Sequence, residues 1–258
     1  MRIARFAEKS DENRKARWGV AEAGFLYPRE TPEGKAAGEP VRLEDARLLA
    51  PAVPSKIICV GQNYLTHIQE MGLDKGLLPM EPGLFIKTPN AVAAPDSIIS
   101  YPSFTAEFHY EGELAVVIGK PMKPGFKNPM EGVLGYTAAL DMTARDRQKD
   151  DLQWIRAKSA DLFCPLGPWI ETELDAGNVA VRTKVNNEMR QDGRTDDLLF
   201  PVDKILRHIL TFMTLEPGDV VLTGTPSGVG PVFPGDRIEV DVEGLGRALA
   251  VTIGPKRE

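Results

Sequence analysis

Residues 111–119 have the sequence Glu-Gly-Glu-Leu-Ala-Val-Val-Ile-Gly, and this stretch decides the fold class and points to the chemistry. Its apolar and β-branched residues, ended by Gly-Lys-Pro at 119–121, predict a β-strand. Alternate side chains of a strand share a face, so Glu111 and Glu113 are expected to point the same way. Two neighbouring carboxylates repel each other and cannot be buried without a partner. A hard, oxygen-binding cation is the simplest partner.

A third acidic residue extends this candidate site. Asp141 lies in a second strand-like run, residues 135–146, with the sequence Gly-Tyr-Thr-Ala-Ala-Leu-Asp-Met-Thr-Ala-Arg-Asp. Three acids on two strands suggest a site for Mg²⁺ or Mn²⁺ with coordination positions left open for substrate. His109 alternates with Glu111 and Glu113 and could add a fourth ligand, but its place at the start of the strand favours a surface or structural role.

The composition is that of an ordinary soluble protein. The chain has 258 residues, enough for one domain with a small appendage, and 42% are hydrophobic while 26% are charged. We expect no membrane span, because no apolar stretch approaches about 20 residues. The first residues lack the apolar core of a signal peptide. The two cysteines, Cys59 and Cys164, lie in apolar stretches and predict buried thiols in a reducing compartment, the cytoplasm.

The charge distribution argues against a nucleic-acid-binding protein. The net charge is −6, and the sequence contains no basic block. An anionic small molecule would therefore need individual Lys and Arg residues near the acids.

Two segments of the chain differ in sequence pattern and predict two domains. Residues 1–53 predict a small β-rich N-terminal domain, and residues 54–258 predict the main domain, with Pro51 and Pro54 marking the boundary. The main domain is dominated by strand signals, starting with a buried strand at 56–60, so the fold class is mostly β with α (α+β). In the N-terminal domain, strands are expected at residues 3–6, 18–21 and 24–27.

Three further local patterns complete the fold prediction. Apolar residues at helical spacing predict a helix from Val202 to about Thr214. The sequence Val-Asn-Asn-Glu at 185–188 predicts a tight hairpin, because Asn tolerates positive φ. The Gly-rich run 223–230 lacks the Gly-Lys-Ser/Thr ending of a phosphate-binding loop, and no helical pattern follows it.

Ordered motifs run along nearly the whole chain, and together they resemble the fumarylacetoacetate hydrolase family. They are Ser-Lys-Ile-Ile-Cys-Val-Gly-Gln-Asn-Tyr-Leu-Thr-His-Ile-Gln-Glu at 55–70, Leu-Phe-Ile-Lys-Thr-Pro at 84–89, the two acidic runs above, Lys-Ser at 158–159, Pro-Leu-Gly-Pro-Trp-Ile at 165–170, and Leu-Glu-Pro-Gly-Asp-Val-Val-Leu-Thr-Gly-Thr-Pro-Ser-Gly-Val-Gly at 215–230.

The resemblance implies a fold, an assembly and a class of substrate. Residues 1–53 look like the small domain of short prokaryotic members, followed by a catalytic domain built as a rolled mixed β-sheet, with the chain forming a homodimer. A divalent ion would be held by Glu111, Glu113 and Asp141. Members of the family act on small anionic 2-oxo acids, by acylpyruvate or fumarylpyruvate hydrolysis, oxaloacetate decarboxylation, or isomerisation and decarboxylation in aromatic catabolism.

It also implies catalytic roles for three residues. His67 and Glu70 share a face if they lie on a helix, so they could form a general-base dyad on a mobile lid that includes residues 72–83. The alternative is an exposed helical pair with a weak interaction. Lys158 would place a positive charge near the substrate or the developing enolate.

Other residues are expected to contact substrate. The resemblance carries over Gln148 and Thr225, and Lys87, Arg145 and Arg190 are further cationic candidates. Arg145 could instead pair with the neighbouring Asp146, and Lys87 or Arg190 could simply face water. Trp154 and Trp169 are expected in the core.

Three positions depart from the family pattern. Leu140 replaces the usual Asn before the metal-binding Asp, Asn187 replaces a hairpin Gly, and Gln62 stands where Arg or Leu is more familiar. Leu140 should face away from Asp141 in a regular strand, so metal binding is expected to survive.

These observations predict a divalent-metal-dependent hydrolase that cleaves a C–C bond in an acylpyruvate- or fumarylpyruvate-type 2,4-dioxo acid. The alternative is an oxaloacetate decarboxylase or a 2-hydroxyhepta-2,4-diene-1,7-dioate isomerase/decarboxylase. Outside the enzymes, the alternatives are a catalytically idle metal-binding or ligand-sensing scaffold and a purely structural metal site.

Overall fold

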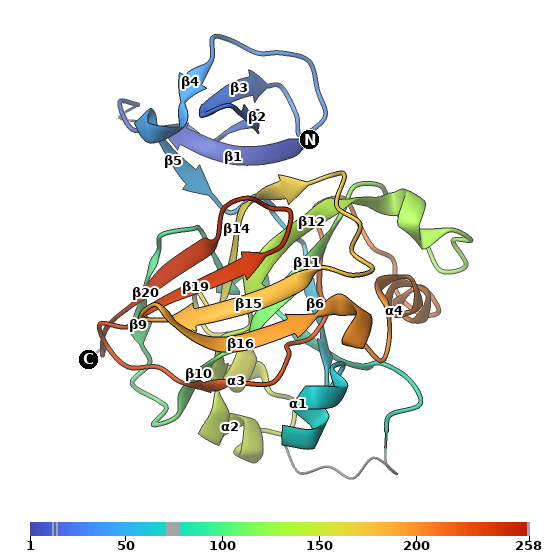
Figure 1. Ribbon diagram of the computed structural model, residues 1–258. Coiled ribbons are helices and arrows are strands. Elements are labelled where there is room, and N and C mark those ends of the chain that lie inside the picture. The colour runs from blue at the N-terminus through green and yellow to red at the C-terminus, as the bar shows by residue number, and fades with distance from the viewer. Residues whose placement is uncertain (12, 14, 71–77, 257–258) are drawn as a thin grey trace.

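The computed structural model describes residues 1–11, 13, 15–70 and 78–256, and within these the protein is built mainly from β-strands (Figure 1). The helices are short: α1 (Leu65–Glu70), α2 (Arg145–Asp150), α3 (Ile155–Lys158) and α4 (Val202–Ile209). The predicted class, mostly β with α, is confirmed. None of the helices in the described part of the chain has the length and apolarity needed to cross a lipid bilayer.

One long mixed sheet forms the framework of the described chain. Its order is β4-β3-β2-β1-β14-β12-β11-β17-β6-β7, with β5 also on β1 and β8 also on β14. These strands are β1 (Arg2–Glu8), β2 (Arg17–Glu22), β3 (Phe25–Arg29), β4 (Val41–Arg42), β5 (Ala46–Leu49), β6 (Ile57–Gly61), β7 (Gly83–Lys87), β8 (Val92–Ala93), β11 (Gly112–Ile118), β12 (Val133–Leu140), β14 (Cys164–Glu171) and β17 (Val220–Leu222).

A second sheet packs on the centre of the first. Its order is β16-β15-β19-β20-β9 (Figure 1). Strand β15 contacts β11, and β19 contacts both β11 and β12. All residues of β11 are buried, which explains why its sequence is apolar without a break at residues 114–118. The strands of the second sheet are β9 (Ile98–Tyr101), β15 (Ala180–Val185), β16 (Glu188–Arg194), β19 (Arg237–Val242) and β20 (Leu249–Lys256), and a small third sheet holds β10 (Phe108–Tyr110), β13 (Thr143–Ala144) and β18 (Gly230–Pro231).

The N-terminal strands join the long sheet directly. Strand β1 pairs with β14, with Ile3 opposite Ile170, and the amino group of Met1 lies 2.8 Å from Glu171. The strands predicted at the N-terminus and at 56–60 are confirmed as β1, β2, β3 and β6, with ends shifted by one or two residues. Figure 1 shows β1, β2 and β3 at one end of the molecule and α1, α2 and α3 at the opposite end.

Two local predictions have different outcomes. The hairpin at 185–188 is confirmed, because Asn186 and Asn187 have φ values of 52° and 66° and link β15 to β16. The helix predicted to reach Thr214 ends at Ile209. The Thr211 amide donates to the carbonyl three residues earlier, on His208, so the chain tightens there into a turn.

Candidate active site

Three buried carboxylates meet where two neighbouring strands of the long sheet begin and end. Glu113 lies in β11, Glu111 directly precedes this strand, and Asp141 directly follows β12. Because Gly112 is opposite Leu140 in the antiparallel register, the flanking acids come together. One carboxylate oxygen from each acid lies within 4.8 Å of the other two. Leu140 belongs to the apolar core, so this departure from the family pattern leaves the acids assembled.

Three cationic side chains surround these acids. The Lys158 Nζ atom is 2.9 Å from Glu111 Oε2 and 2.6 Å from Asp141 Oδ2. Arg145 donates to the other Glu111 oxygen, and Lys87 Nζ lies 2.6 Å from Asp141 Oδ1. Burial raises the pKa of Glu111, but Lys158 and Arg145 together hold that pKa well below its usual range. Burial lowers the pKa of Lys158, yet Asp141 and Glu111 raise that pKa overall.

Two features of the acids indicate room for a metal ion. Glu113 has no ion-pair partner among the described residues, and its Oε2 atom accepts a hydrogen bond from Gly224 N at 2.6 Å. Burial, followed by the charges of Asp141 and Glu111, raises the pKa of Glu113 well above its usual range. The buried Asp141 Oδ1 atom accepts no hydrogen bond from the described residues, although the Lys87 ammonium group lies beside it. A divalent cation would satisfy both acids, and an all-carboxylate donor set suits Mg²⁺ or Mn²⁺.

Lys87 lies behind the acids, so the structure contradicts its predicted contact with substrate. The side chain has no exposed surface. Its ammonium group donates to the carbonyl oxygens of Met142 at 3.1 Å, Phe163 at 3.0 Å and Lys158. All three N–H donors are therefore used, which is why the nearby Asp141 Oδ1 receives none of them. Lys87 holds the backbone around the site instead of facing a ligand.

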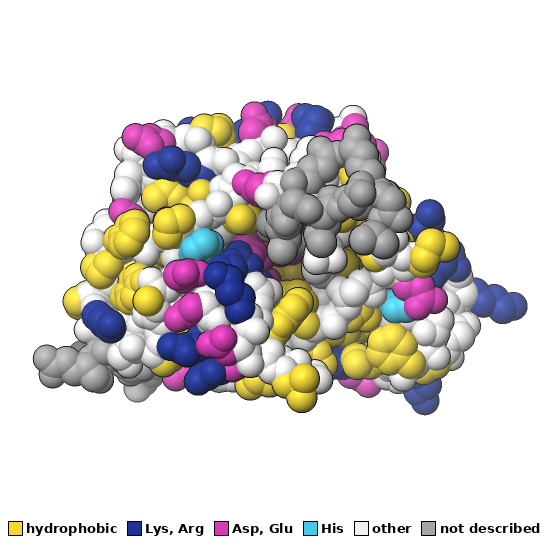
Figure 2. Space-filling view, turned by 90° about the horizontal axis from the view of Figure 1, so that it is seen from below, with side chains coloured by type: hydrophobic (Ala, Val, Ile, Leu, Met, Phe, Trp, Pro, Cys, Tyr) yellow, Lys and Arg dark blue, Asp and Glu magenta, His cyan; other side chains and the backbone are white. Residues whose placement is uncertain are grey.

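A cavity of about 230 Å³ opens onto the acids. Arg145, Gln148, Lys158 and Thr225 line it, so the structure brings these predicted residues together with the acids. The volume is below the 300–1,000 Å³ typical of pockets for drug-sized ligands and suits a small acid. Figure 2 shows the face that carries α1, α2 and α3, where basic, acidic and apolar side chains lie intermixed around a recess.

The cavity wall also contains residues that were not predicted there. Gln62, Phe85, Lys149 and Trp154 line it, and the expected core position of Trp154 is wrong, because its half-buried ring stands on the wall 5.5 Å from the Phe85 ring. Gln62 and Trp154 have φ values of 55° and 51°, a left-handed conformation that costs free energy for residues other than Gly. Gln62 could have been found from its departure within the family motif, whereas the sequence around Trp154 carries no such signal.

Arg145 connects the acids to the rim of the cavity. Besides contacting Glu111, its guanidinium group donates to Gln148 Oε1 at 2.6 Å. The alternative pair with Asp146 is not formed, because that carboxylate accepts hydrogen bonds from Thr105, from Ala106 N at 3.2 Å and from Arg147 N at 2.9 Å. Arg145 is thus oriented towards the site by an acid on one side and an amide on the other.

The predicted dyad is only partly described. Residues 65–70 form α1, as expected, and the Glu70 carboxylate accepts a hydrogen bond from Gly228 N at 3.0 and 3.1 Å. The side chain of His67 and residues 71–77 of the expected lid lie outside the described part of the chain. Pairing of His67 with Glu70 therefore stays a prediction.

Two other candidates lie apart from the acid cluster. His109 is half-buried and is not part of the group of possible ligand atoms, and burial followed by the charge of Arg145 lowers its pKa to about 4. Arg190 is exposed and pairs with Glu188 at 2.7 Å. His109 is therefore a structural histidine rather than a fourth ligand, and Arg190 is a surface residue rather than a substrate contact.

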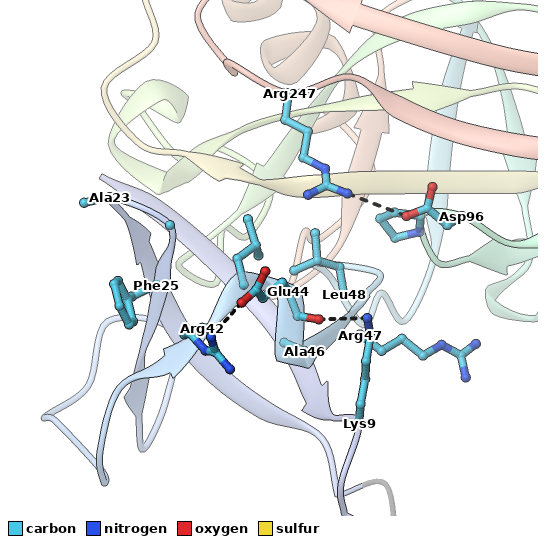
Figure 3. A pocket seen from close by; sticks show the side chains of 13 residues that line it. Lys9, Ala23, Phe25, Arg42, Glu44, Ala46, Arg47, Leu48, Asp96 and Arg247 are labelled. Carbon is cyan, nitrogen blue, oxygen red and sulfur yellow. Dashed lines mark hydrogen bonds and ion pairs between the residues drawn. The ribbon is translucent and has the colours of Figure 1, made fainter.

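A larger hollow, of about 760 Å³, lies between the N-terminal strands and the main domain (Figure 3). Its charged side chains are exposed and largely engaged with one another. Arg42 lies 2.8 Å from Glu44 and Arg247 lies 3.7 Å from Asp96, while Lys9 donates to the Glu44 carbonyl oxygen at 2.8 Å. Without a buried ionisable group, this hollow lacks the chemistry of the smaller cavity despite its size.

Family models match both parts of the chain. Residues 56–252 match the model described as fumarylacetoacetate (FAA) hydrolase C-terminal, and residues 1–51 match the model Rv2993c-like, N-terminal. The mitochondrial oxaloacetate tautomerase FAHD1 of Bos taurus is 41% identical over 196 residues, which are 73% of this chain and 87% of that protein.

Solved structures share the fold. A 5-carboxymethyl-2-hydroxymuconate delta-isomerase from Mycobacterium smegmatis has a TM-score of 0.88 and 40% identity, with all of both chains covered. A fumarylpyruvate hydrolase from Pseudomonas aeruginosa, in complex with Mn²⁺ and pyruvate, has a TM-score of 0.71 and 33% identity, covering 81% of this chain and 92% of that one.

Proposed function

Because this chain belongs to the fumarylacetoacetate hydrolase family, we propose that it is a divalent-metal-dependent enzyme that hydrolyses a C–C bond in a small 2,4-dioxo acid of the acylpyruvate or fumarylpyruvate type. The observation that carries this proposal is the cluster of Glu111, Glu113 and Asp141, which is buried, faces a small cavity and is flanked by cations. The solved hydrolase relative that holds Mn²⁺ and pyruvate supports both the ion and a 2-oxo acid ligand.

The charges of the site favour an anionic substrate. The three carboxylates are matched in number by Lys87, Arg145 and Lys158. When bound by the acids, Mg²⁺ or Mn²⁺ would supply a Lewis acid for the keto group of a 2-oxo acid. With all three acids ionised, the two charges of the ion are then in excess and attract an anion.

The cationic residues around the cavity have distinct roles. Lys158 and Arg145 border the cavity, so their positive charges stabilise a carboxylate and the negative charge that develops on the keto oxygen. Gln148 is held by Arg145 and offers its amide nitrogen to the substrate. Lys87 acts from behind by holding Asp141 and the Lys158 carbonyl in place.

Hydrolysis also needs a base that activates water, and we assign this role to His67 with Glu70. Helix α1 lies at the same end of the molecule as α2 and α3, whose residues line the cavity (Figure 1). Glu70 is anchored on Gly228, three residues after Thr225 of the cavity wall. A carboxylate beside His67 would orient the imidazole and raise its basicity.

The second candidate is oxaloacetate decarboxylation, or isomerisation and decarboxylation of a 2-hydroxyhepta-2,4-diene-1,7-dioate. The relative from Bos taurus is an oxaloacetate tautomerase, and the isomerase from M. smegmatis matches over the full chain. Decarboxylation, tautomerisation and C–C hydrolysis all develop negative charge on the oxygen of a 2-oxo acid, so the same acids and cations serve each of them. Hydrolysis differs in needing the water-activating base.

The test is turnover by the Mn²⁺-loaded enzyme on acetylpyruvate, fumarylpyruvate and oxaloacetate, with His67→Ala compared in parallel. We expect wild type to cleave the acylpyruvates, and His67→Ala to lose this activity while any action on oxaloacetate persists. Action on oxaloacetate alone would replace hydrolysis by the second candidate. Glu113→Gln is the control for metal dependence, and an idle scaffold would show no turnover in any form.

A further inference from the structure

A buried amide on the second sheet contacts both the acids and the cavity wall. Gln191 lies in β16, has no exposed surface and does not line the cavity. Its Oε1 atom accepts a hydrogen bond from Gly112 N at 2.9 Å. Its Nε2 atom donates to Thr225 Oγ1 at 2.8 Å and to the Pro226 carbonyl oxygen at 2.9 Å. One side chain thus links the peptide between two metal-binding acids to the loop that carries Thr225.

The direction of each hydrogen bond is fixed. A backbone N–H can only donate and a carbonyl can only accept, so Gly112 and Pro226 allow one orientation of the Gln191 amide. Thr225 must then accept from Gln191, and its own hydrogen goes to the Gly112 carbonyl oxygen at 2.9 Å. Towards the cavity, the Thr225 hydroxyl has only a lone pair left to offer.

The packing around Gly112 supports this contact independently. A Cβ atom at this position would lie 2.0 Å from Thr183 Oγ1 and 3.2 Å from Gln191 Oε1. Only Gly lets the second sheet come this close to the peptide between Glu111 and Glu113. The Glu-Gly-Glu sequence is therefore required by the approach of β15 and β16 to the acids.

We propose that Gln191 is a positioning residue of the active site, acting through two arms. One arm fixes the Glu111–Gly112–Glu113 backbone, and so the directions in which both carboxylates point. The other arm fixes Thr225 as a hydrogen-bond acceptor, which suits a hydroxyl group such as the enol form of a 2-oxo acid. The first arm rests on the metal centre of the proposed function, and partners of this kind change metal affinity or activity by about 10–100-fold.

The test compares Gln191→Met with Thr183→Val by calorimetric titration with Mn²⁺. Thr183 is the matched control because it is paired with Gln191 across the two strands, is equally buried, and its hydroxyl has no hydrogen-bond partner among the described residues. We expect Gln191→Met to bind Mn²⁺ about 10–100-fold more weakly, and Thr183→Val to bind as wild type does. If wild type and Gln191→Met bind Mn²⁺ equally well and have equal kcat/KM, the positioning role of Gln191 is overturned, while the proposed function stands. Absence of Mn²⁺ binding by wild type would overturn the proposed function and the inference with it.

A second variant keeps the proposal testable if Gln191→Met does not fold. Gln191→Glu retains an acceptor for Gly112 N but, when ionised, cannot donate to Thr225. We expect it to bind Mn²⁺ while kcat/KM falls at least about 10-fold. The loss should be non-additive with that of Thr225→Val, because the two side chains form one unit. An unchanged kcat/KM for Gln191→Glu, or strictly additive losses, would overturn the arm that acts through Thr225.

Discussion

Replacing Lys87 by Met is expected to destabilise the fold strongly, although the substitution roughly preserves shape. Lys87 is fully buried, donates to three carbonyl oxygens and lies 2.6 Å from Asp141. Each buried acceptor left unpaired costs about 1–3 kcal/mol. Losing one partner of a buried ion pair costs about 3–5 kcal/mol as a whole. Both energies describe the same missing ammonium group, so we expect the free energy of unfolding to fall by about 3–5 kcal/mol rather than by their sum.

Urea unfolding of metal-free protein at neutral pH measures this loss. Metal must be removed, because an ion bound only by the folded state would add stability that grows with the logarithm of its concentration relative to its Kd. Lys149→Met is the matched control, since Lys149 is exposed and its pair with Glu107 spans 3.4 Å at the surface, where such pairs contribute about 0–1 kcal/mol.

A loss below about 1 kcal/mol for Lys87→Met would refute the idea that Lys87 holds the site from behind. A double-mutant cycle with Asp141→Asn then separates the ion pair from the carbonyl contacts. If the pair matters, the double variant should be more stable than the sum of the single losses predicts.

Four further predictions concern metal binding, acid stability and assembly. Glu113→Gln should abolish Mn²⁺ binding, measured by calorimetry, because it removes a buried ligand. The protein should stay folded, because the Gln amide oxygen can still accept the hydrogen bond from Gly224 N. Tight Mn²⁺ binding by this variant would contradict the assignment of Glu113 as a metal ligand. Adding Mn²⁺ at about 100 times its Kd should stabilise wild type by about 2.7 kcal/mol, and EDTA should reverse this in thermal melts. Burial alone would raise the pKa of Asp219, but hydrogen bonds, led by the one from Lys56, hold this pKa below its usual value. The ionised Asp219 carboxylate therefore stabilises the fold at pH values above its unfolded-state pKa of about 3.9, and this stabilisation is lost as pH falls through the lower folded-state pKa. The stability difference between wild type and Asp219→Asn should therefore shrink as urea midpoints are taken from pH 6 towards pH 3, and a constant difference would contradict this. Sedimentation should give the mass of two chains, as the expected homodimer requires, and a single-chain mass would exclude it.

The acid cluster could be predicted because its signal is local. Glu111 and Glu113 are two residues apart on a strand, and the strand that ends before Asp141 is the antiparallel neighbour. The hairpin at 186–187 was equally readable, since two consecutive Asn residues favour the positive φ that the turn needs.

Other features depend on contacts that no local pattern encodes. Lys87 is the last residue of an edge strand, and its direction depends on the carbonyl oxygens of Met142 and Phe163, which are far away in sequence. Gln191 lies in a strand whose sequence is mostly polar, so nothing in the sequence distinguishes it, and only the packing of the second sheet places it beside Gly112. The end of α4 at Ile209 was missed because the apolar spacing continues into a turn that packs on the same core.

The pairing of β1 with β14 has a consequence for how the chain reaches its folded state. The contact between Met1 and Glu171 joins residues 170 positions apart, so β1 is synthesised long before β14, the strand with which it pairs. Strands β1, β2 and β3 pair locally, and β5 covers the second edge of β1 from Arg5 to Glu8. The part of this edge at Arg2 and Ile3 stays open until β14 arrives. An open edge is a template for pairing with another chain. We expect aggregation during synthesis to be greatest in this interval, and truncations before residue 164, where β14 begins, to be the least soluble.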